Sequence, residues 1–144
     1  MKWQDSLAEL YEGPRMTGRL WVMAPGVIAT RVVGHVDASA VRWYTSRVDR
    51  MLLDGRTIQT FHDWSGIDSF DSDVRGPYRA WAERHVQLVK PPHFLIRSKI
   101  LAMAISATAL VLSHGLVAHT ERREFEEALQ DAIFAARTTE SIRP

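Results

Sequence analysis

The chain has 144 residues, 46% of them hydrophobic, which is enough for one domain with a substantial core. Its 18 basic and 17 acidic residues nearly cancel to a net charge of +1, which argues against a nucleic-acid-binding protein and against attraction to an anionic membrane. Cysteine is absent, which excludes disulfides, thiol catalysis and cysteine-based zinc sites. Because the first ten residues also lack the apolar run of a secretory signal, we expect a cytoplasmic protein.

The N-terminal segment, residues 1–17, predicts a short amphipathic helix that extends from the domain. Its large apolar side chains recur at helical spacing until a Gly-Pro pair ends the run: Trp3, Leu7, Leu10 and Tyr11. Residues 20–23 and 27–33 are rich in strand-forming residues and are separated by an Ala-Pro-Gly turn signal. This pattern predicts a β-hairpin.

A helix and a central strand follow the hairpin. Asp37 is a favourable N-cap, and the apolar residues after it form a one-sided stripe that an Asp-Gly pair ends: Val41, Tyr44, Val48, Met51 and Leu52. Residues 57–61 are β-branched and aromatic, which favours a strand. From His62 to Asp73, aspartates, serines and a glycine dominate, so we expect a polar loop and then a helix that begins at Asp73 or Gly76.

The last third of the chain also alternates strands and helices. Short strands are predicted at residues 93–96 and 116–119. Between them, residues 100–112 predict an apolar helix, whose length favours a buried helix over a membrane span. A final helix has an apolar stripe opposite charged residues, and residues 138–144 are expected to form a C-terminal tail.

The predicted order of elements is β-β-α-β-α-β-α-β-α within one domain, residues 18–137. Strands that alternate with helices after a hairpin predict an α/β domain. We expect a mostly parallel sheet with one antiparallel strand and with helices packed on it.

The most specific motif of the chain lies between residues 63 and 72. It is Asp63-Trp64-Ser65-Gly66-Ile67, followed by Asp71-Ser72. This pattern resembles the Asp-Leu-Ser-Gly-Val…Asp-Ser signature of the STAS domain, the SpoIIAA-like family of bacterial anti-sigma-factor antagonists. With the order of elements, the resemblance extends over residues 18–137, and it implies a STAS-like fold. The chain looks more similar to the divergent SpoIIAA-like proteins than to the sporulation regulators of the family. The fold of these divergent proteins is similar to that of CRAL-TRIO lipid-binding domains.

The resemblance implies that Ser72 is a phosphorylation site. In that family the serine after the second aspartate lies at a helix N-terminus and is phosphorylated by a partner kinase. The family usually continues Ser-Gly-Leu-Gly, whereas this chain continues Asp73-Val74-Arg75-Gly76. A purely structural role is the alternative, because serine and aspartate at such positions often cap a helix.

We predict that a protein partner, an anti-sigma factor, a kinase-like protein or another regulator, binds the loop formed by residues 63–76. The residues expected to contact it are Asp63, Trp64, Ser65, Phe70, Asp71, Ser72, Asp73 and Arg75. Aromatic side chains often dominate interfaces, which favours a surface role for Trp64 and Phe70. The alternative is that the aromatic residues pack the polar loop against the domain.

The same segment gives little support for catalysis. Asp63 and Asp71 could bind a divalent cation, but loop aspartates more often hydrogen-bond their own backbone. His62, Asp63 and Ser65 are residue types of a catalytic triad, yet neighbours on a strand point to opposite faces and no Gly-x-Ser-x-Gly motif is present. The other histidines lack the spacing of a helical zinc pair. We therefore predict a protein that is not an enzyme and has no metal or other cofactor.

Three functions remain open from the sequence. The first is a non-enzymatic regulatory or scaffolding protein of the STAS type. The second is a binding protein for a small apolar ligand or lipid, enclosed by the helix at residues 100–112 and its facing strands, as the similarity to CRAL-TRIO domains implies. The third is a structural subunit that forms a homo-oligomer through the N-terminal helix or an exposed sheet edge.

Overall fold

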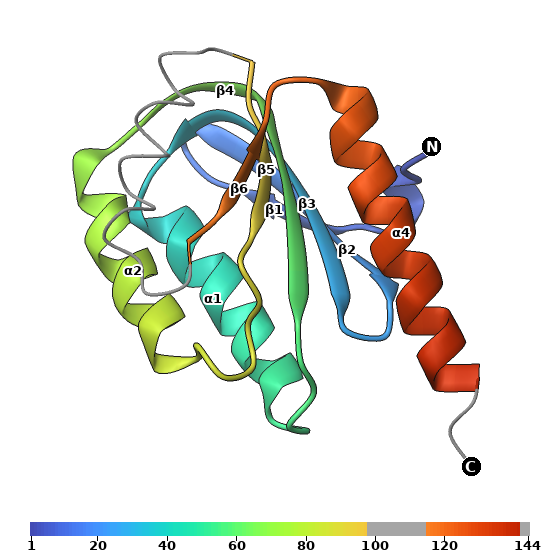
Figure 1. The fold of residues 1–144 in the computed structure, drawn as a ribbon. Coiled ribbons are helices and arrows are strands. Elements are labelled where there is room, and N and C mark those ends of the chain that lie inside the picture. The colour runs from blue at the N-terminus through green and yellow to red at the C-terminus, as the bar shows by residue number, and fades with distance from the viewer. Residues whose placement is uncertain (98–114, 142–144) are drawn as a thin grey trace.

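The computed structural model describes residues 1–97 and 115–141 and contains one six-stranded sheet (Figure 1). The strands lie side by side in chain order: β1 (Glu9–Glu12), β2 (Met16–Ala24), β3 (Val27–Val36), β4 (Gln59–Phe70), β5 (His93–Leu95) and β6 (Val117–His119). The other described elements are the helices α1 (Ala38–Leu52), α2 (Arg75–Arg84) and α4 (Arg122–Ser141) and the 3-10 turns η1 (Asp5–Leu7) and η2 (Ser72–Val74). The helix predicted at residues 100–112 lies outside the described residues.

Strand pairing changes from antiparallel to parallel at β3. β1 pairs with β2, and β2 with β3, in antiparallel fashion, whereas the pairs from β3 to β6 are parallel. Among the described strands, β2 therefore runs against all the others. The predicted mostly parallel sheet with one antiparallel strand is confirmed, and β1 is an additional edge strand that the sequence analysis does not anticipate.

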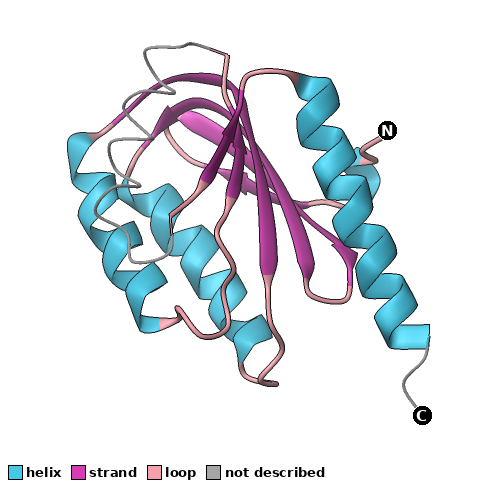
Figure 2. Cartoon of the chain, viewed as in Figure 1, coloured by secondary structure: helices cyan, strands magenta, loops and turns pink. Residues whose placement is uncertain are grey.

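Helices cover both faces of this sheet, α1 and α2 on one side and α4 on the other (Figures 1 and 2). Neighbouring side chains of β2 point to opposite faces of the sheet. Leu20 packs with α1 and α2, and Trp21 packs with α4. The predicted stripe on the last helix is confirmed, since α4 buries Phe125, Leu129 and Ala132.

The start and the buried face of α1 are also as predicted. The carboxylate of Asp37 accepts a hydrogen bond from the backbone N–H of Ala40 at 3.2 Å, which caps the first turn. The buried residues of α1 are three members of the predicted stripe and one small residue before it: Ala40, Tyr44, Val48 and Leu52.

The predicted N-terminal helix is wrong. Residues 9–12 form β1, in which Leu10 pairs with Arg19 at the edge of β2. The helical spacing does not mark a buried face, because Leu7 is 71% exposed and Leu10 is 54% exposed. Trp3 is a core residue instead, with its ring edge-on to Trp21 at 5.1 Å. Backbone hydrogen bonds to the open edge of the sheet outweigh the weak helical tendency of this short segment.

The predicted polar loop after residue 61 is also wrong, because β4 continues to Phe70. Its backbone pairs with β3 along the whole length, until Phe70 lies opposite Val36, and two register shifts interrupt the ladder. Polar residues remain in the strand because their side chains find partners, as Asp63 finds Arg31 on β3. The segment 63–76 is therefore mostly a strand, which leaves the sheet only after Phe70.

The predicted C-terminal tail is partly helical. α4 continues beyond the predicted end at Arg137 to Ser141, because no glycine or proline interrupts that stretch. The strands predicted at 93–96 and 116–119 are confirmed as β5 and β6. The limits proposed for the domain, residues 18 and 137, stay predictions.

Candidate functional site

Asp63 is a buried ionic centre on the face of the sheet that α4 covers. Its carboxylate, 1% exposed, accepts hydrogen bonds from Nε of Arg31 at 2.9 Å and from Nη2 of Arg122 at 3.1 Å. The hydroxyl of Ser65 donates to the same carboxylate at 2.6 Å, and its backbone N–H donates at 3.1 Å. This network joins β3, β4 and the first turn of α4.

The environment of Asp63 keeps the carboxyl group ionised. Burial acts to raise the pKa of Asp63, but hydrogen bonds from Ser65 and Arg31 and the charge of Arg122 outweigh it and lower the pKa below its usual value. The sequence predicts Asp63 as a partner contact, whereas the structure places it in the interior. Sequence reasoning misses Arg31 and Arg122 because they lie 32 and 59 residues away along the chain.

Ser72 lies at the opposite end of the predicted segment, exposed at the start of a helical stretch. η2 begins at Ser72 and runs directly into α2, which begins at Arg75. Asp73 and Arg75 are exposed beside Ser72, and Val74, 5% exposed, anchors the turn in the core. Asp71 precedes η2 and makes no side-chain cap hydrogen bond. We call residues 71–75 the Ser72 turn; it brings four of the predicted contact residues together.

The imidazole of His35 holds the end of β4 against β3. Its Nδ1 lies 2.6 Å from Oγ of Ser69, and its Nε2 lies 2.7 Å from Oδ1 of Asp71. The backbone N–H of Asp71 also donates to the carbonyl of Val36 at 2.9 Å. These contacts set the point at which the chain leaves the sheet and enters the Ser72 turn. No local pattern could indicate His35, because its partners lie 34 and 36 residues away.

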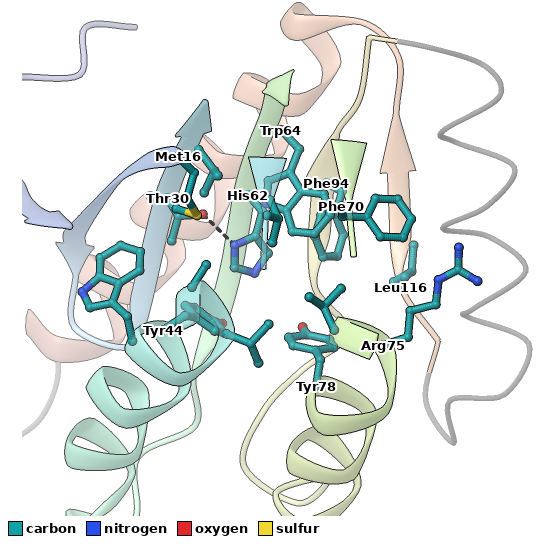
Figure 3. A pocket seen from close by; sticks show the side chains of 16 residues that line it. Met16, Thr30, Tyr44, His62, Trp64, Phe70, Arg75, Tyr78, Phe94 and Leu116 are labelled. Carbon is teal, nitrogen blue, oxygen red and sulfur yellow. Dashed lines mark hydrogen bonds between the residues drawn. The ribbon is translucent and has the colours of Figure 1, made fainter. Parts of the chain in front are cut away.

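A cavity of about 100 Å³ lies beside the Ser72 turn, between the sheet and the helices α1 and α2 (Figure 3). Most of its described lining is apolar. The apolar residues include Met16, Val32, Val36, Ala40, Val41, Phe94 and Leu116.

Trp64 and Phe70 are half-buried in the wall of this cavity. The ring of Trp64 lies edge-on to Phe94 with 4.9 Å between the ring centroids. The guanidinium carbon of Arg75 lies 5.0 Å from the centroid of the Phe70 ring, which is a cation–π distance. The two aromatic residues therefore pack around the cavity, and Phe70 also supports the exposed Arg75.

His62 is a polar residue in the cavity wall. It is 4% exposed, and its Nδ1 lies 2.7 Å from the hydroxyl of Thr30. Burial, and to a smaller extent the neighbouring His93, lowers the pKa of His62 to about 3, so the ring is neutral near pH 7. Burial also raises the pKa of the phenols of Tyr44 and Tyr78, which keeps them uncharged. Arg75 is the one charged side chain in the described lining.

The geometry argues against a triad of His62, Asp63 and Ser65. His62 faces α1, with its ring edge-on to Tyr44 at 5.0 Å, whereas Asp63 faces Arg122 of α4. The two side chains thus point to opposite faces, as predicted. Within residues 1–97 and 115–141, no cluster of three histidine, aspartate or glutamate residues could hold a metal ion, and no helix is long and apolar enough to span a membrane.

No protein-family model and no curated protein matches the sequence. Solved structures do match the fold. An uncharacterized protein with a SpoIIAA-like fold from Shewanella loihica is 11% identical, with a TM-score of 0.58 over 85% of this chain and 91% of that chain. The anti-sigma factor antagonist SpoIIAA in its unphosphorylated form is 14% identical, with a TM-score of 0.55 over 87% and 96%. SpoIIAA of Bacillus in its phosphorylated form is 14% identical, with a TM-score of 0.50 over 84% and 98%.

At these identities the likeness concerns the fold, and it covers most of both chains in each comparison. It agrees with the motif at residues 63–72 and with the order of strands and helices observed here. The protein therefore has the SpoIIAA-like fold of STAS domains.

Proposed function

We propose that the protein is a non-enzymatic, cytoplasmic regulatory or scaffolding protein of the STAS type, which binds a protein partner through the Ser72 turn. Phosphorylation of Ser72 switches this binding. The observation that carries the proposal is the exposure of Ser72, which is the first residue of a helical stretch two residues after the end of β4. The similarity to SpoIIAA, an anti-sigma factor antagonist known in unphosphorylated and phosphorylated forms, supports a serine switch on this fold.

A phosphate on Ser72 would change the charge of the surface around the turn. A phosphoserine carries about −2 charge, and free backbone N–H groups at a helix start favour anions. Arg75 is exposed one turn further on and could pair with the phosphate, whereas the carboxylates of Asp71 and Asp73 would repel it. Phosphorylation would therefore redistribute charge on an exposed turn and leave the buried Val74 anchor in place.

The partner surface in this proposal is small and carries both signs of charge. Around the turn, the exposed polar residues on the end of β4, on η2 and on the first half of α2 are Asp68, Ser69, Ser72, Asp73, Arg75 and Arg79. A protein partner with complementary charges fits such a surface, and mutation of these residues should act mainly on the association rate.

Intact-mass measurement tests the switch. The protein purified from its own host should carry one phosphate that a phosphatase removes. The dephosphorylated protein should regain this phosphate after incubation with host extract and ATP. Ser72→Ala should abolish the gain. Ser46→Ala, at an exposed serine on α1, is the matched control and should keep it. An unmodified chain, or a phosphate that persists in Ser72→Ala, would contradict the switch.

Photo-crosslinking in host cells tests the partner surface. A crosslinking residue at Asp73 should capture a distinct protein, and the same residue at Ser46 should not. Ser72→Glu in the same chain should change the captured amount several-fold. Equal capture from both positions would argue against the Ser72 turn as the binding surface.

A further inference from the structure

Nε2 of His62 is a buried polar atom that faces the cavity and has no hydrogen-bond partner among the described residues. The side chain is 4% exposed, and the ring points from β4 into the space lined by Tyr44 and Tyr78 (Figure 3). A buried donor or acceptor that is left unpaired destabilises the folded protein, because it has lost its hydrogen bonds to water. Such unpaired buried atoms are rare in folded proteins, so we expect Nε2 to form a hydrogen bond with a group other than the described residues.

The hydrogen bond to Thr30 decides which kind of partner is needed. A hydroxyl has one proton to donate, and among the described residues Nδ1 of His62 is the acceptor that the Thr30 hydroxyl meets. Donation by this hydroxyl requires Nδ1 to accept, so in the neutral ring we assign the proton of the imidazole to Nε2. Nε2 is therefore an N–H donor directed into the cavity.

The remaining walls restrict the size and the polarity of what can bind there. The cavity of about 100 Å³ is smaller than the apolar cavity of about 150 Å³ that binds benzene in an engineered protein, but it is partly open, so a single five-membered ring can fill it and reach the surface. Its described polar groups are neutral apart from Arg75. A charged ligand would lose its hydration without a buried counterion.

We propose that this cavity is a binding site for a small, neutral, mostly apolar molecule with one hydrogen-bond acceptor, such as a ketone or ester carbonyl, which accepts from Nε2 of His62. The apolar part of the ligand fills the space between α1, α2 and the sheet. This site is independent of the proposed phosphorylation of Ser72, although Phe70, Val74 and Arg75 of the neighbouring segment form part of its wall.

NMR titration of the wild-type protein with cyclopentanone and with cyclopentane tests the site. Both probes should shift the methyl signals of Val32, Val36 and Val74. Cyclopentanone alone should also shift the ring ¹⁵N signal of His62 Nε2. The proposal is overturned if neither probe shifts these methyl groups, which would mean a void or a bound water only, or if the ring spectrum shows the proton on Nδ1.

Two variants and a control separate the hydrogen bond from the cavity. His62→Phe should weaken the binding of cyclopentanone about five-fold, which corresponds to about 1 kcal/mol, and should change the affinity for cyclopentane by less than about two-fold. His119→Phe makes the same change on the α4 face, next to Phe125, and should affect neither probe. Ala40→Leu, which fills the cavity from α1, should abolish both. An equal loss of affinity for both probes in His62→Phe would overturn the proposal, and so would retained binding in Ala40→Leu. The ¹⁵N result on the wild-type protein tests the site even if a variant fails to fold.

Discussion

The carboxylate of Asp63 on β4 lies 2.9 Å from Nε of Arg31 on β3, and Arg122 of α4 completes the pairing. Removing the carboxylate leaves two guanidinium groups without their acceptor, but their side chains are 31% and 46% exposed and can turn toward water. We expect Asp63→Ala to lower the free energy of unfolding by about 2–3 kcal/mol, less than for a fully buried ion pair.

Urea denaturation measures this change, and Arg123→Ala is its control. Arg123 pairs with Glu127 one turn further along α4, with both side chains mostly exposed, so its loss should cost less than about 0.5 kcal/mol. Similar values for the two variants would show that the Asp63 network does not stabilise the contact between the sheet and α4.

The buried neutral ring of His62 should make the protein less stable in acid. Burial holds the pKa of His62 at about 3 in the folded protein, whereas the unfolded chain binds the proton near pH 6.5. Between these values the unfolded state binds more protons, so stability is present above about pH 6.5 and is lost as the pH falls toward 3. The slope from this group approaches about 1.4 kcal/mol per pH unit. Denaturation curves at pH 7, 6 and 5 should show a shallower decline for His62→Phe, and parallel declines would contradict the buried neutral ring.

Gly34 is required where β3 and β4 shift register. It has φ +105°, and a Cβ at this position would lie 2.4 Å from the carbonyl oxygen of Arg15. Gly34→Ala should therefore destabilise the protein by about 3 kcal/mol or more, since strain and a main-chain clash add. Gly55→Ala is the control, because φ is +75° there but no atom lies within 4 Å, and about 1 kcal/mol is expected. Equal midpoints in urea would mean that the backbone at Gly34 relaxes freely.

Trp3 should contribute much more to stability than its neighbour Leu7. Its ring is 8% exposed, packs on Trp21 and Phe125, and lies 4.4 Å from the guanidinium carbon of Arg31. Trp3→Ala should lower the free energy of unfolding by about 3 kcal/mol, whereas Leu7→Ala, at a side chain 71% exposed, should change it by less than about 0.5 kcal/mol. If the two variants are equally stable, the N-terminal segment is not part of the core.

Local signals predict the elements that depend on neighbours in the sequence. The Asp37 cap and the stripe through Tyr44 and Val48 describe α1 correctly, because a helix is built from contacts three and four residues apart. The alternation of strands and helices likewise predicts the parallel sheet, and the motif at residues 63–72 agrees with the fold.

Long-range contacts explain what the sequence does not predict. The composition of residues 62–70 favours a loop, but pairing with β3, and with β5 at residues 62 and 63, keeps this stretch extended. The partners of Asp63 and of His35 come from other elements, so no spacing rule selects them. The cavity at His62 requires α1, α2 and the sheet to be packed first, and therefore cannot be inferred from a linear pattern.

The adjacent residues His62 and Asp63 impose an alignment on the sheet. A slip of β4 by one residue would turn every side chain to the other face, as it does in any strand. The carboxylate would then enter the mostly apolar wall of the cavity and lose Arg31 and Arg122, and the imidazole would meet these two arginines. Apolar neighbours such as Phe61 could be accommodated on either side more readily. These two polar residues therefore discriminate against misregistered pairing, and they make the correct alignment of β4 a condition for folding.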